Sequence, residues 1–369
     1  MKKRYNYIIQ GAGASGLWLA YWLHKEGLLD DKTLLIVECD EFKQNDRTWC
    51  FWGDALIQDL GFVDFSWSQV QVFGESQRID PYTYHHCRSE AFYAFVKNAL
   101  ASSGHIDWCF GRVVATRQIG SQVSVDIQID NDAGVENLNV AAEWFFGSGG
   151  ASVKTSEIAL WQSFVGWRVK SKSGETIFDS AACTLMDFRI EQRRKTRFLY
   201  VLPFSGEEAL IEVTQFDKEI LGLEEGQRML QEICEMRGWD VSMTELEQNA
   251  IPMSSIFDCS ERFHAPDTRI VPLGVVAGAL KPTTGYGFLR MMQHGKSIAS
   301  ALKSNELIPK LYRKRRFRFY DDLLLRILHK HPSRGKQIFD QLFQHQRAST
   351  VLRFLNEKTN LLQEVMIFL

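Results

Sequence analysis

The sequence predicts an α/β fold built from two sheets and followed by a C-terminal helical segment. Three features of the 369 residues lead to this prediction. An apolar strand runs through a glycine loop into a helix near residue 10, a set of strands lies between residues 166 and 216, and a basic amphipathic stretch follows residue 305. At this length the chain suits a first domain with a second domain inserted into it.

The first strand ends in a glycine-rich loop that opens a helix. Gly11, Gly13 and Gly16 follow the pattern G-x-G-x-x-G. These glycines permit a tight turn, a close approach of the backbone to a pyrophosphate and close packing of the helix on the strand. A second strand over residues 33–37 ends at Glu38, whose carboxylate can accept the ribose hydroxyls of an adenosine. This pattern is typical of a Rossmann-like dinucleotide-binding domain, and the acid favours FAD or NAD over NADP.

Residues 42–56 are expected to form a loop that is rich in aromatic side chains. Trp49, Phe51 and Trp52 stand in this loop. Two interpretations stay open, because such side chains either cover a bound group or pack beneath the loop as ordinary core.

A helix is expected over residues 89–101, with Ser89 as a plausible N-cap. His85 and His86 precede it, but no third ligand lies at a suitable spacing, so we interpret them as structural side chains. The seven cysteines form no C-x-x-C pair and no zinc spacing, which indicates reduced thiols in a cytosolic protein. No metal site is predicted.

The rest of the chain supplies the remaining elements in order. We expect a β-meander over 109–146 that returns to the parallel sheet at a glycine turn over 147–150. One antiparallel sheet should follow, formed by 166–170, 184–189, 198–203 and 209–216. After it we expect an amphipathic helix over 223–237, a buried strand over 269–278, and a glycine turn with a helix start over 281–300. The antiparallel sheet is expected to roof a substrate cavity.

These elements suggest three regions. Residues 1–80, 105–155 and 265–305, with the helix over 89–101, are expected to form the nucleotide-binding domain. Residues 156–264 are expected to form the substrate domain, and residues 306–369 a basic, helical C-terminal region.

The charge of the chain limits its partners. A net charge of −2 gives no general attraction to nucleic acid, and no nucleic-acid recognition module is present. The apolar strand after the basic start Met1–Arg4 is too short for a signal-peptide core, and no stretch reaches about 18 consecutive apolar residues, so neither a signal peptide nor a membrane span is expected. Residues 310–336 hold ten Lys and Arg among apolar side chains, which is typical either of a solvated helix face or of a helix that rests on an anionic bilayer.

Several motifs together resemble the bacterial lycopene cyclase family of FAD-dependent carotenoid enzymes. The matching segments run in family order over roughly residues 5–325 and are 7–19, 45–52, 84–92, 185–188, 198–204, 209–214 and 278–287. The resemblance implies a redox-neutral β-cyclisation of lycopene or a related acyclic carotenoid. In that reaction the ψ-end is protonated, the neighbouring double bond attacks the cation, and loss of a proton leaves a β-ring.

The resemblance also implies the remaining parts of the site. The cofactor would be FAD in its reduced form, with NAD(P)H as a candidate reductant, and Arg47, Gly278 and Gly285 would join the glycine loop in binding it. The protein would be cytoplasmic, at the inner face of the cytoplasmic membrane. Tyr286 and Phe288, with the aromatic cluster of residues 49–52, are candidates to stabilise a carbocation, since aromatic faces attract positive charge.

Glu212 is the candidate catalytic acid. The period of two along residues 209–216 places it on one face with Leu210 and Thr214, so a single carboxyl stands among mostly apolar neighbours. If that face lines a cavity, burial raises its pKa and keeps it protonated near neutral pH, as a general acid requires. The pattern alone leaves open a glutamate on the solvent face of an edge strand, and the resemblance favours the acid.

The chain departs from the family at two positions. Many members carry a second acid next to the glutamate, where this chain has Val213, and Asp187 is the nearest replacement unless it caps a turn. Ala279 follows Gly278 where many flavin hydroxylases have Gly-Asp, so weaker flavin retention is expected. Two other functions stay open, a flavin monooxygenase or isoprenoid reductase that acts on a lipophilic substrate and a prenyl-binding carrier without the chemistry.

Overall fold

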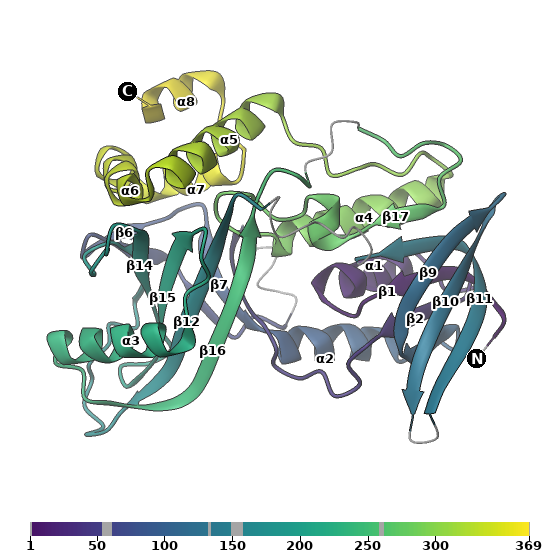
Figure 1. The fold of residues 1–369 in the computed structure, drawn as a ribbon, viewed down its shortest axis with the longest axis horizontal. Helices are drawn as coiled ribbons and strands as arrows, with labels where there is room; N and C mark the ends of the chain where they lie inside the picture. Colours follow the sequence, from purple (N-terminus) through teal and green to yellow (C-terminus); the bar gives the residue numbers. More distant parts are fainter. Residues whose placement is uncertain (1, 54–60, 132–133, 149–157, 258–261, 369) are drawn as a thin grey trace.

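The computed structural model describes residues 2–53, 61–131, 134–148, 158–257 and 262–368. It contains two large sheets side by side, with helices packed on both and a group of C-terminal helices above the second (Figure 1). The predicted α/β class is confirmed. Gly149 and Gly150 of the predicted second glycine turn, and Cys259, lie outside the described residues.

The first sheet carries the predicted nucleotide loop. Its strands lie in the order β8 (Ile106–Phe110), β2 (Leu34–Glu38), β1 (Arg4–Gln10), β11 (Gly134–Gly147), β10 (Gln122–Asn131) and β9 (Arg112–Ile119), and β17 (Ile270–Pro272) pairs with β11. The end of β11 runs parallel to β1 and its start runs antiparallel to β10, so the meander rejoins the parallel sheet as predicted. The helices α1 (Ala14–Lys25), α2 (Ser89–Leu100) and α4 (Phe288–Ser304) share one apolar core with this sheet.

The second sheet contains the four predicted strands and three more. The order is β16 (Val241–Met253), β12 (Leu160–Ser171), β15 (Glu208–Asp217), β14 (Thr196–Pro203), β13 (Ala182–Asp187), β5 (Gln69–Val72) and β6 (Glu75–Arg78). The sequence missed β16, because this long edge strand is mostly exposed and polar and shows no apolar alternation. Residues 69–78 lie in this sheet and not in the first, because β5 pairs with β13.

The two faces of the second sheet have different neighbours. Helix α3 (Leu223–Arg237), found at its predicted bounds, covers one face through Val165, Ile211 and Val213. The other face meets the C-terminal helices, where Phe198 and Phe216 pack with Leu325. Glu212 alternates with Ile211 and Val213 and therefore belongs to this second face.

The predicted aromatic loop is wrong in its second half. Residues 48–53 form a strand, β3 (Thr48–Gly53), which pairs with β7 (Thr83–Arg88) in a small sheet with β4 (Phe65–Trp67). Phe51 and Trp52 are buried and Trp49 is half-buried, and Trp49 and Phe51 each stack on Phe288 with ring centroids 5.0 Å apart. Aromatic residues favour such half-buried strands, and here that preference decides the structure.

Two further expectations need correction. Ser89 is not an N-cap, because α2 begins at Ser89 itself and its Oγ accepts the backbone N–H of Arg47. The expected strand over 269–278 stops at Pro272 and continues as the 3₁₀ turn η3 (Gly274–Ala277), which ends at Gly278 with φ +78°.

The C-terminal region is helical, as predicted. It contains α5 (Arg315–Lys330), the 3₁₀ turn η4 (Pro332–Arg334), α6 (Gly335–His345), α7 (Ala348–Leu355) and α8 (Leu361–Phe368), which lie over the second sheet (Figure 1). Helix α5 turns Phe317, Leu325 and Leu328 inward. Its buried Asp321 is held by Lys281 and Arg313, which ties the helix to the turn before α4. No helix among the described residues is long and apolar enough to cross a membrane.

Candidate active site

The glycine loop between β1 and α1 is shaped for close contact. Gly11 has φ +94°, and a Cβ on Gly16 would lie 1.9 Å from the carbonyl oxygen of Gly11. Helix α1 starts directly after Gly13 with no side-chain cap. The buried Ser15 hydroxyl in its first turn has no hydrogen-bond partner among the described residues. The loop thus presents a helix N-terminus and one unused hydroxyl at the end of the parallel sheet.

Glu38, at the end of the neighbouring strand β2, lies beside the glycine loop. Its carboxylate is 6% exposed and accepts the backbone N–H of Ala12 at 2.7 Å and that of Cys39 at 2.8 Å. Burial alone would favour the neutral acid, but Lys43, 3.3 Å away, and these hydrogen bonds outweigh burial and hold the pKa of Glu38 below its ordinary value. Glu38 is therefore an anion beside the loop.

The structure separates the other predicted cofactor residues. Gly278 ends the turn η3, and Gly274 at the start of that turn lies against the Ser15 side chain, so η3 borders the glycine loop. Gly285 has φ +70° and lies against Gln162 of the second sheet, two residues before the Gly287 N-cap of α4. Arg47 is exposed before β3, and its guanidinium donates to the carbonyl oxygen of Asp46 at 2.7 Å.

Glu212 lines a cavity of about 130 Å³ between the second sheet and the turn before α4. Its strand, β15, lies between β12 and β14, so the alternative of an edge strand facing solvent is wrong. Thr214 Oγ1 donates to Glu212 Oε1 at 2.6 Å. Burial, followed by the charge of Glu247, raises the pKa of Glu212 to about 8. The carboxyl is therefore mostly protonated at neutral pH.

Aromatic side chains form the wall opposite Glu212. Trp49, Tyr286 and Phe288 line the same cavity. Tyr286 packs edge-on against Trp52 with ring centroids 4.5 Å apart, and its hydroxyl lies 2.8 Å from that of Tyr84. The cavity thus places the neutral Glu212 together with several aromatic rings.

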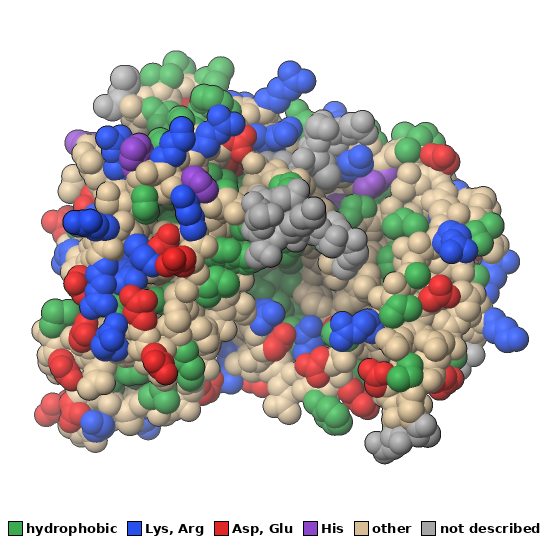
Figure 2. Space-filling model, viewed as in Figure 1, with side chains coloured by type: hydrophobic (Ala, Val, Ile, Leu, Met, Phe, Trp, Pro, Cys, Tyr) green, Lys and Arg blue, Asp and Glu red, His purple; other side chains and the backbone are tan. Residues whose placement is uncertain are grey.

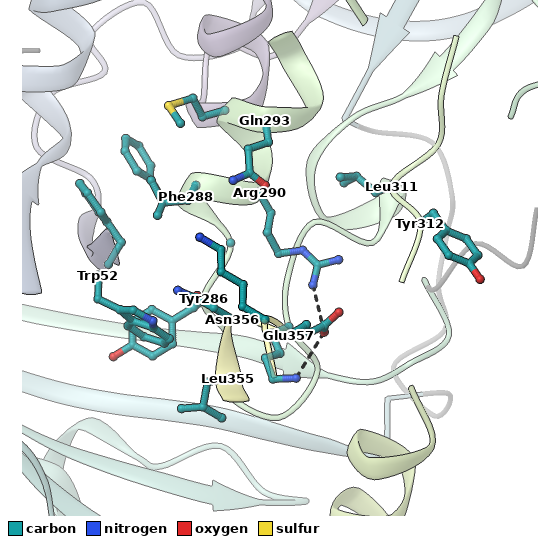
Figure 3. Close-up of a pocket in the computed structure, with 16 residues that line it drawn as sticks. Trp52, Tyr286, Phe288, Arg290, Gln293, Leu311, Tyr312, Leu355, Asn356 and Glu357 are labelled. Atoms are coloured by element: carbon teal, nitrogen blue, oxygen red, sulfur yellow. Dashed lines mark hydrogen bonds and ion pairs between the residues drawn. The ribbon is translucent and has the colours of Figure 1, made fainter. Parts of the chain in front are cut away.

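Two more cavities meet at Tyr286. A cavity of about 410 Å³ opens beside the start of α4, where Figure 3 shows Trp52, Tyr286 and Phe288 on one side and Glu357, paired with Arg290 and Lys281, on the other. A narrow apolar pocket runs between the second sheet and α6 and α7 and includes Trp52 and Tyr286. The surface is also hollowed between the two halves of the molecule (Figure 2). Glu212 therefore stands at one end of a set of mainly apolar spaces.

The Glu212 cavity holds a second carboxyl that no pattern in the sequence predicts. Glu247, on the unpredicted strand β16, lines the same cavity. Its Oε2 accepts a hydrogen bond from Thr48 at 2.9 Å. Burial raises the pKa of Glu247 above its ordinary value, so this carboxyl also resists ionisation. Only the strand pairing of β16 with β12 brings the two acids together, and no sequence motif marks that pairing.

Asp187 does not replace the missing acid at position 213. It pairs with Leu199, which in turn pairs with Val213, so it lies on the α3 face of the sheet and away from Glu212. Burial disfavours its charge, but hydrogen bonds from Arg189 and Arg237 prevail and lower the pKa of Asp187 to about 2. A carboxylate ionised in this way is no proton donor at neutral pH.

The paired histidines lie in the core. His85 bonds to Ser66 at 2.8 Å, and burial lowers its pKa to about 4, while His86 lies 3.4 Å from Asp64. Among the described residues, no group of three His, Cys, Asp or Glu side chains could hold a metal ion.

The glycine loop on the first sheet and the second sheet beside it form an α/β arrangement that this chain shares with solved structures. It superimposes on a geranylgeranyl bacteriochlorophyll reductase-like protein from Thermoplasma acidophilum (TM-score 0.63, 14% identity, 99% of this chain and 96% of that one). It also superimposes on p-nitrophenol 4-monooxygenase from Pseudomonas putida (TM-score 0.62, 14% identity, 100% and 98%). At such identities these similarities establish the fold.

The chain belongs to the lycopene cyclase protein family, whose model matches residues 6–369. Two relatives are both named lycopene beta-cyclase. The one from Pantoea ananas is 22% identical over 298 residues, 78% of this chain and 72% of the relative. The one from Pseudescherichia vulneris is 23% identical over 304 residues, 80% and 73%. The resemblance seen in the sequence motifs is confirmed.

Proposed function

We propose that this protein is a FAD-dependent, redox-neutral lycopene β-cyclase that forms β-rings on an acyclic carotenoid. The observation that carries the proposal is Glu212, a carboxyl held neutral in an apolar cavity opposite aromatic rings. Family membership and the names of the two relatives support the choice of substrate.

The residues around the glycine loop fit FAD. The unpartnered Ser15 hydroxyl and the uncapped start of α1 suit the pyrophosphate, and the Glu38 carboxylate suits the ribose. The turn at Gly278 and the start of α4 after Gly285 offer further backbone N–H groups. When bound in its reduced form, the flavin supplies an electron-rich ring that stabilises positive charge, and NAD(P)H is the reductant we propose for it.

In this proposal Glu212 donates its proton to the terminal double bond of the ψ-end. The neighbouring double bond then attacks the cation, and loss of a proton completes the β-ring with no net change in electrons. Trp49, Tyr286 and Phe288 face the developing charge without attacking it, because aromatic rings attract cations and are poor nucleophiles here. The apolar walls exclude water, which would otherwise trap the cation as an alcohol.

Expression of the chain in bacteria that accumulate lycopene tests the function. We expect carotenoids with β-rings, and pigment analysis distinguishes one ring from two. Unchanged lycopene in cells that contain the folded, flavin-loaded protein would contradict the proposal. Oxidation of NAD(P)H in proportion to product would indicate a monooxygenase or reductase instead, and a purified protein that never takes up flavin would indicate a carrier.

The rate of ring formation should depend on pH through Glu212. The active form of this group is the protonated one, and its pKa is raised to about 8. Activity should therefore fall as the pH rises from 7 through 8, where Glu212 loses its proton. The check is a pH profile of purified, flavin-loaded enzyme, with circular dichroism at each pH to show that the fold persists. A rate that rises from pH 7 to pH 9 would contradict a neutral acid at this position.

We also propose peripheral contact with the inner face of the cytoplasmic membrane. We assign this contact to a different surface from the one the sequence suggested, because α5 buries Phe317, Leu325 and Leu328 and exposes only Phe319 and Leu323 among its large apolar side chains. Apolar side chains instead gather at the top of the molecule over α8 (Figure 2). We call this the α8 patch, and its members, all 53–79% exposed, are Leu361, Leu362, Val365, Met366 and Phe368.

Positive charge lies beside the α8 patch. Glu364 of α8 pairs with Arg316 of α5, and the preceding Lys314 and Arg315 are exposed. An apolar helix face with flanking basic residues suits a surface of anionic lipids.

Replacing Leu362 and Met366 by glutamate should weaken binding to anionic lipid vesicles about tenfold or more, since each side chain would otherwise leave water on binding. Sedimentation with phosphatidylglycerol vesicles measures the effect. Met236→Glu, on the exposed side of α3, is the matched control and should leave binding unchanged. Equal binding by the double variant and the wild type would exclude the α8 patch.

A further inference from the structure

Three residues on neighbouring strands form a row across the cavity face of the second sheet. Glu247 of β16 pairs with Gly166 of β12, and Gly166 pairs with Glu212 of β15. Residues in such a row point to the same face. Two carboxyls therefore flank a residue that has no side chain.

Gly166 leaves the space that Glu247 fills. A Cβ at this position would lie 3.0 Å from Glu247 Cγ and 3.2 Å from Glu247 Oε1. The Glu247 side chain therefore lies over Gly166 and points toward Glu212. Any larger residue at 166 would push Glu247 away.

The two oxygens of Glu247 are in different situations. Oε2 is held by the hydroxyl of Thr48. Oε1 is buried and accepts no hydrogen bond from any residue that the structure describes. A buried carboxyl oxygen without a partner is costly, so its retention beside a cavity suggests that it receives a proton there.

The two arginines near Glu247 are each paired with another carboxylate. Arg168 pairs with Glu208 at 2.6 Å, and Arg88 pairs with Glu90 at 3.2 Å and with Glu245 at 3.4 Å. These two arginines, together with Glu245, His86, Thr48 and Glu247 itself, line a small polar pocket of about 70 Å³ on the far side of Glu247. Burial lowers the pKa of His86, so it stays neutral. Glu247 therefore stands between this polar pocket and the Glu212 cavity.

The groups that face Glu212 are mostly neutral. Cys50 of β3 and Tyr200 of β14 lie nearby, and burial raises the pKa of each well above its ordinary value. Tyr84 and Tyr286 are raised by burial in the same way. Glu247 is thus the one acidic neighbour, among the described residues of this cavity, able to exchange a proton with Glu212 near neutral pH.

We propose that Glu212 and Glu247 form a carboxyl pair that shares one proton, in which Glu247 is the base of the cyclisation. This inference rests on the proposed function. The protonated Glu212 gives its proton to the ψ-end as its O–H bond breaks and a C–H bond forms. After ring closure, the Glu247 carboxylate takes the proton that the ring cation loses, and the C–H electrons become the ring double bond. Transfer of that proton from Glu247 to Glu212 restores the starting state, so no proton is consumed.

The pair can be tested without any carotenoid. Infrared difference spectroscopy of the purified protein follows the band of a protonated carboxyl as the pH rises. The variant Glu212→Gln assigns the Glu212 band by removing it. In Glu247→Gln the Glu212 band should titrate at a pH lower by about 1 unit, because a negative neighbour is gone. Glu219→Gln, whose side chain is 82% exposed beyond the end of β15, is the matched control and should leave the band in place.

A kinetic test follows with flavin-loaded enzyme and lycopene. Glu247→Gln should lower the rate of ring formation by about 100-fold or more, within the range for loss of one acid-base group. Glu247→Asp should recover part of the rate, and Gly166→Ala should reproduce the defect because it displaces Glu247. Thr48→Val removes the hydrogen bond to Glu247 but leaves the carboxyl in place, and it should shift the pH profile. This variant keeps the proposal testable if Glu247→Gln fails to fold.

The outcomes separate this inference from the proposed function. An unchanged Glu212 band and a normal rate in folded Glu247→Gln would overturn the pair while leaving the cyclase intact. A wild-type protein that forms no rings would overturn the cyclase, and the infrared titration would still decide whether the two carboxyls share a proton.

Discussion

Glu212→Gln should abolish ring formation, with a loss of about 100-fold to 10,000-fold in rate. Glutamine has the size of glutamic acid and can accept the hydrogen bond from Thr214, but it has no acidic proton to donate. Because the side chain lies inside an existing cavity, the fold and the flavin site should be kept. Pigment analysis, flavin absorbance and thermal unfolding measure the three properties in one preparation.

The matched control for this prediction is Glu219→Gln. Glu219 follows the same strand, but its side chain is 82% exposed and pairs only loosely with Lys195, at 3.5 Å. This variant should cyclise normally. If Glu212→Gln forms rings at a near-normal rate, Glu212 has no part in the proton transfer.

Gly16→Ala should destroy the flavin site and destabilise the protein by about 3 kcal/mol. The new methyl group would lie 1.9 Å from the carbonyl oxygen of Gly11 and 3.0 Å from the side chain of Ile9. The clash with the backbone is relieved only if the loop moves away from α1. That movement removes the cradle that we assign to the pyrophosphate. Flavin content and the midpoint of thermal unfolding are the measurements.

Gly13→Ala separates the two effects of the glycine loop. A Cβ at Gly13 meets nothing within 4 Å, and its φ is −82°, so alanine fits the protein itself. This variant should keep wild-type stability and lose flavin affinity, because only a bound pyrophosphate would meet the methyl group. Gly104→Ala, also in open space, should change neither property. Full flavin retention in both loop variants would mean that FAD does not bind at this loop.

Local patterns predicted the parts of the site that lie within one segment. The loop from Gly11 to Gly16 and the acid at Glu38 follow from one strand, one turn and the next strand. The period of two placed Glu212 on one face with Leu210 and Thr214 but left open whether that face meets solvent, and the structure places its strand in the interior of the sheet. Helix α3 shows a clear amphipathic period and was found at its bounds.

The remaining parts depend on contacts between distant segments. Glu247 joins the cavity through the pairing of β16, a polar edge strand whose sequence carries no alternation. Asp187 was the nearest candidate for a second acid, but the pairing of β13 with β14 places it on the opposite face of the sheet from Glu212. Leu325 and Leu328 of α5 are buried against the second sheet, whereas the α8 patch is exposed. Which helix face meets solvent depends on the packing of the whole C-terminal region.

A single-turnover reaction in D₂O tests most directly whether an enzyme carboxyl protonates the polyene. Wild-type enzyme, loaded with flavin, equilibrated in D₂O and in excess over lycopene, should yield β-rings that each carry one deuterium by mass spectrometry. Glu212→Gln under the same conditions should yield unchanged lycopene. Rings that contain no deuterium, or rings formed at the same rate by the variant, would contradict ring closure driven by a proton from Glu212.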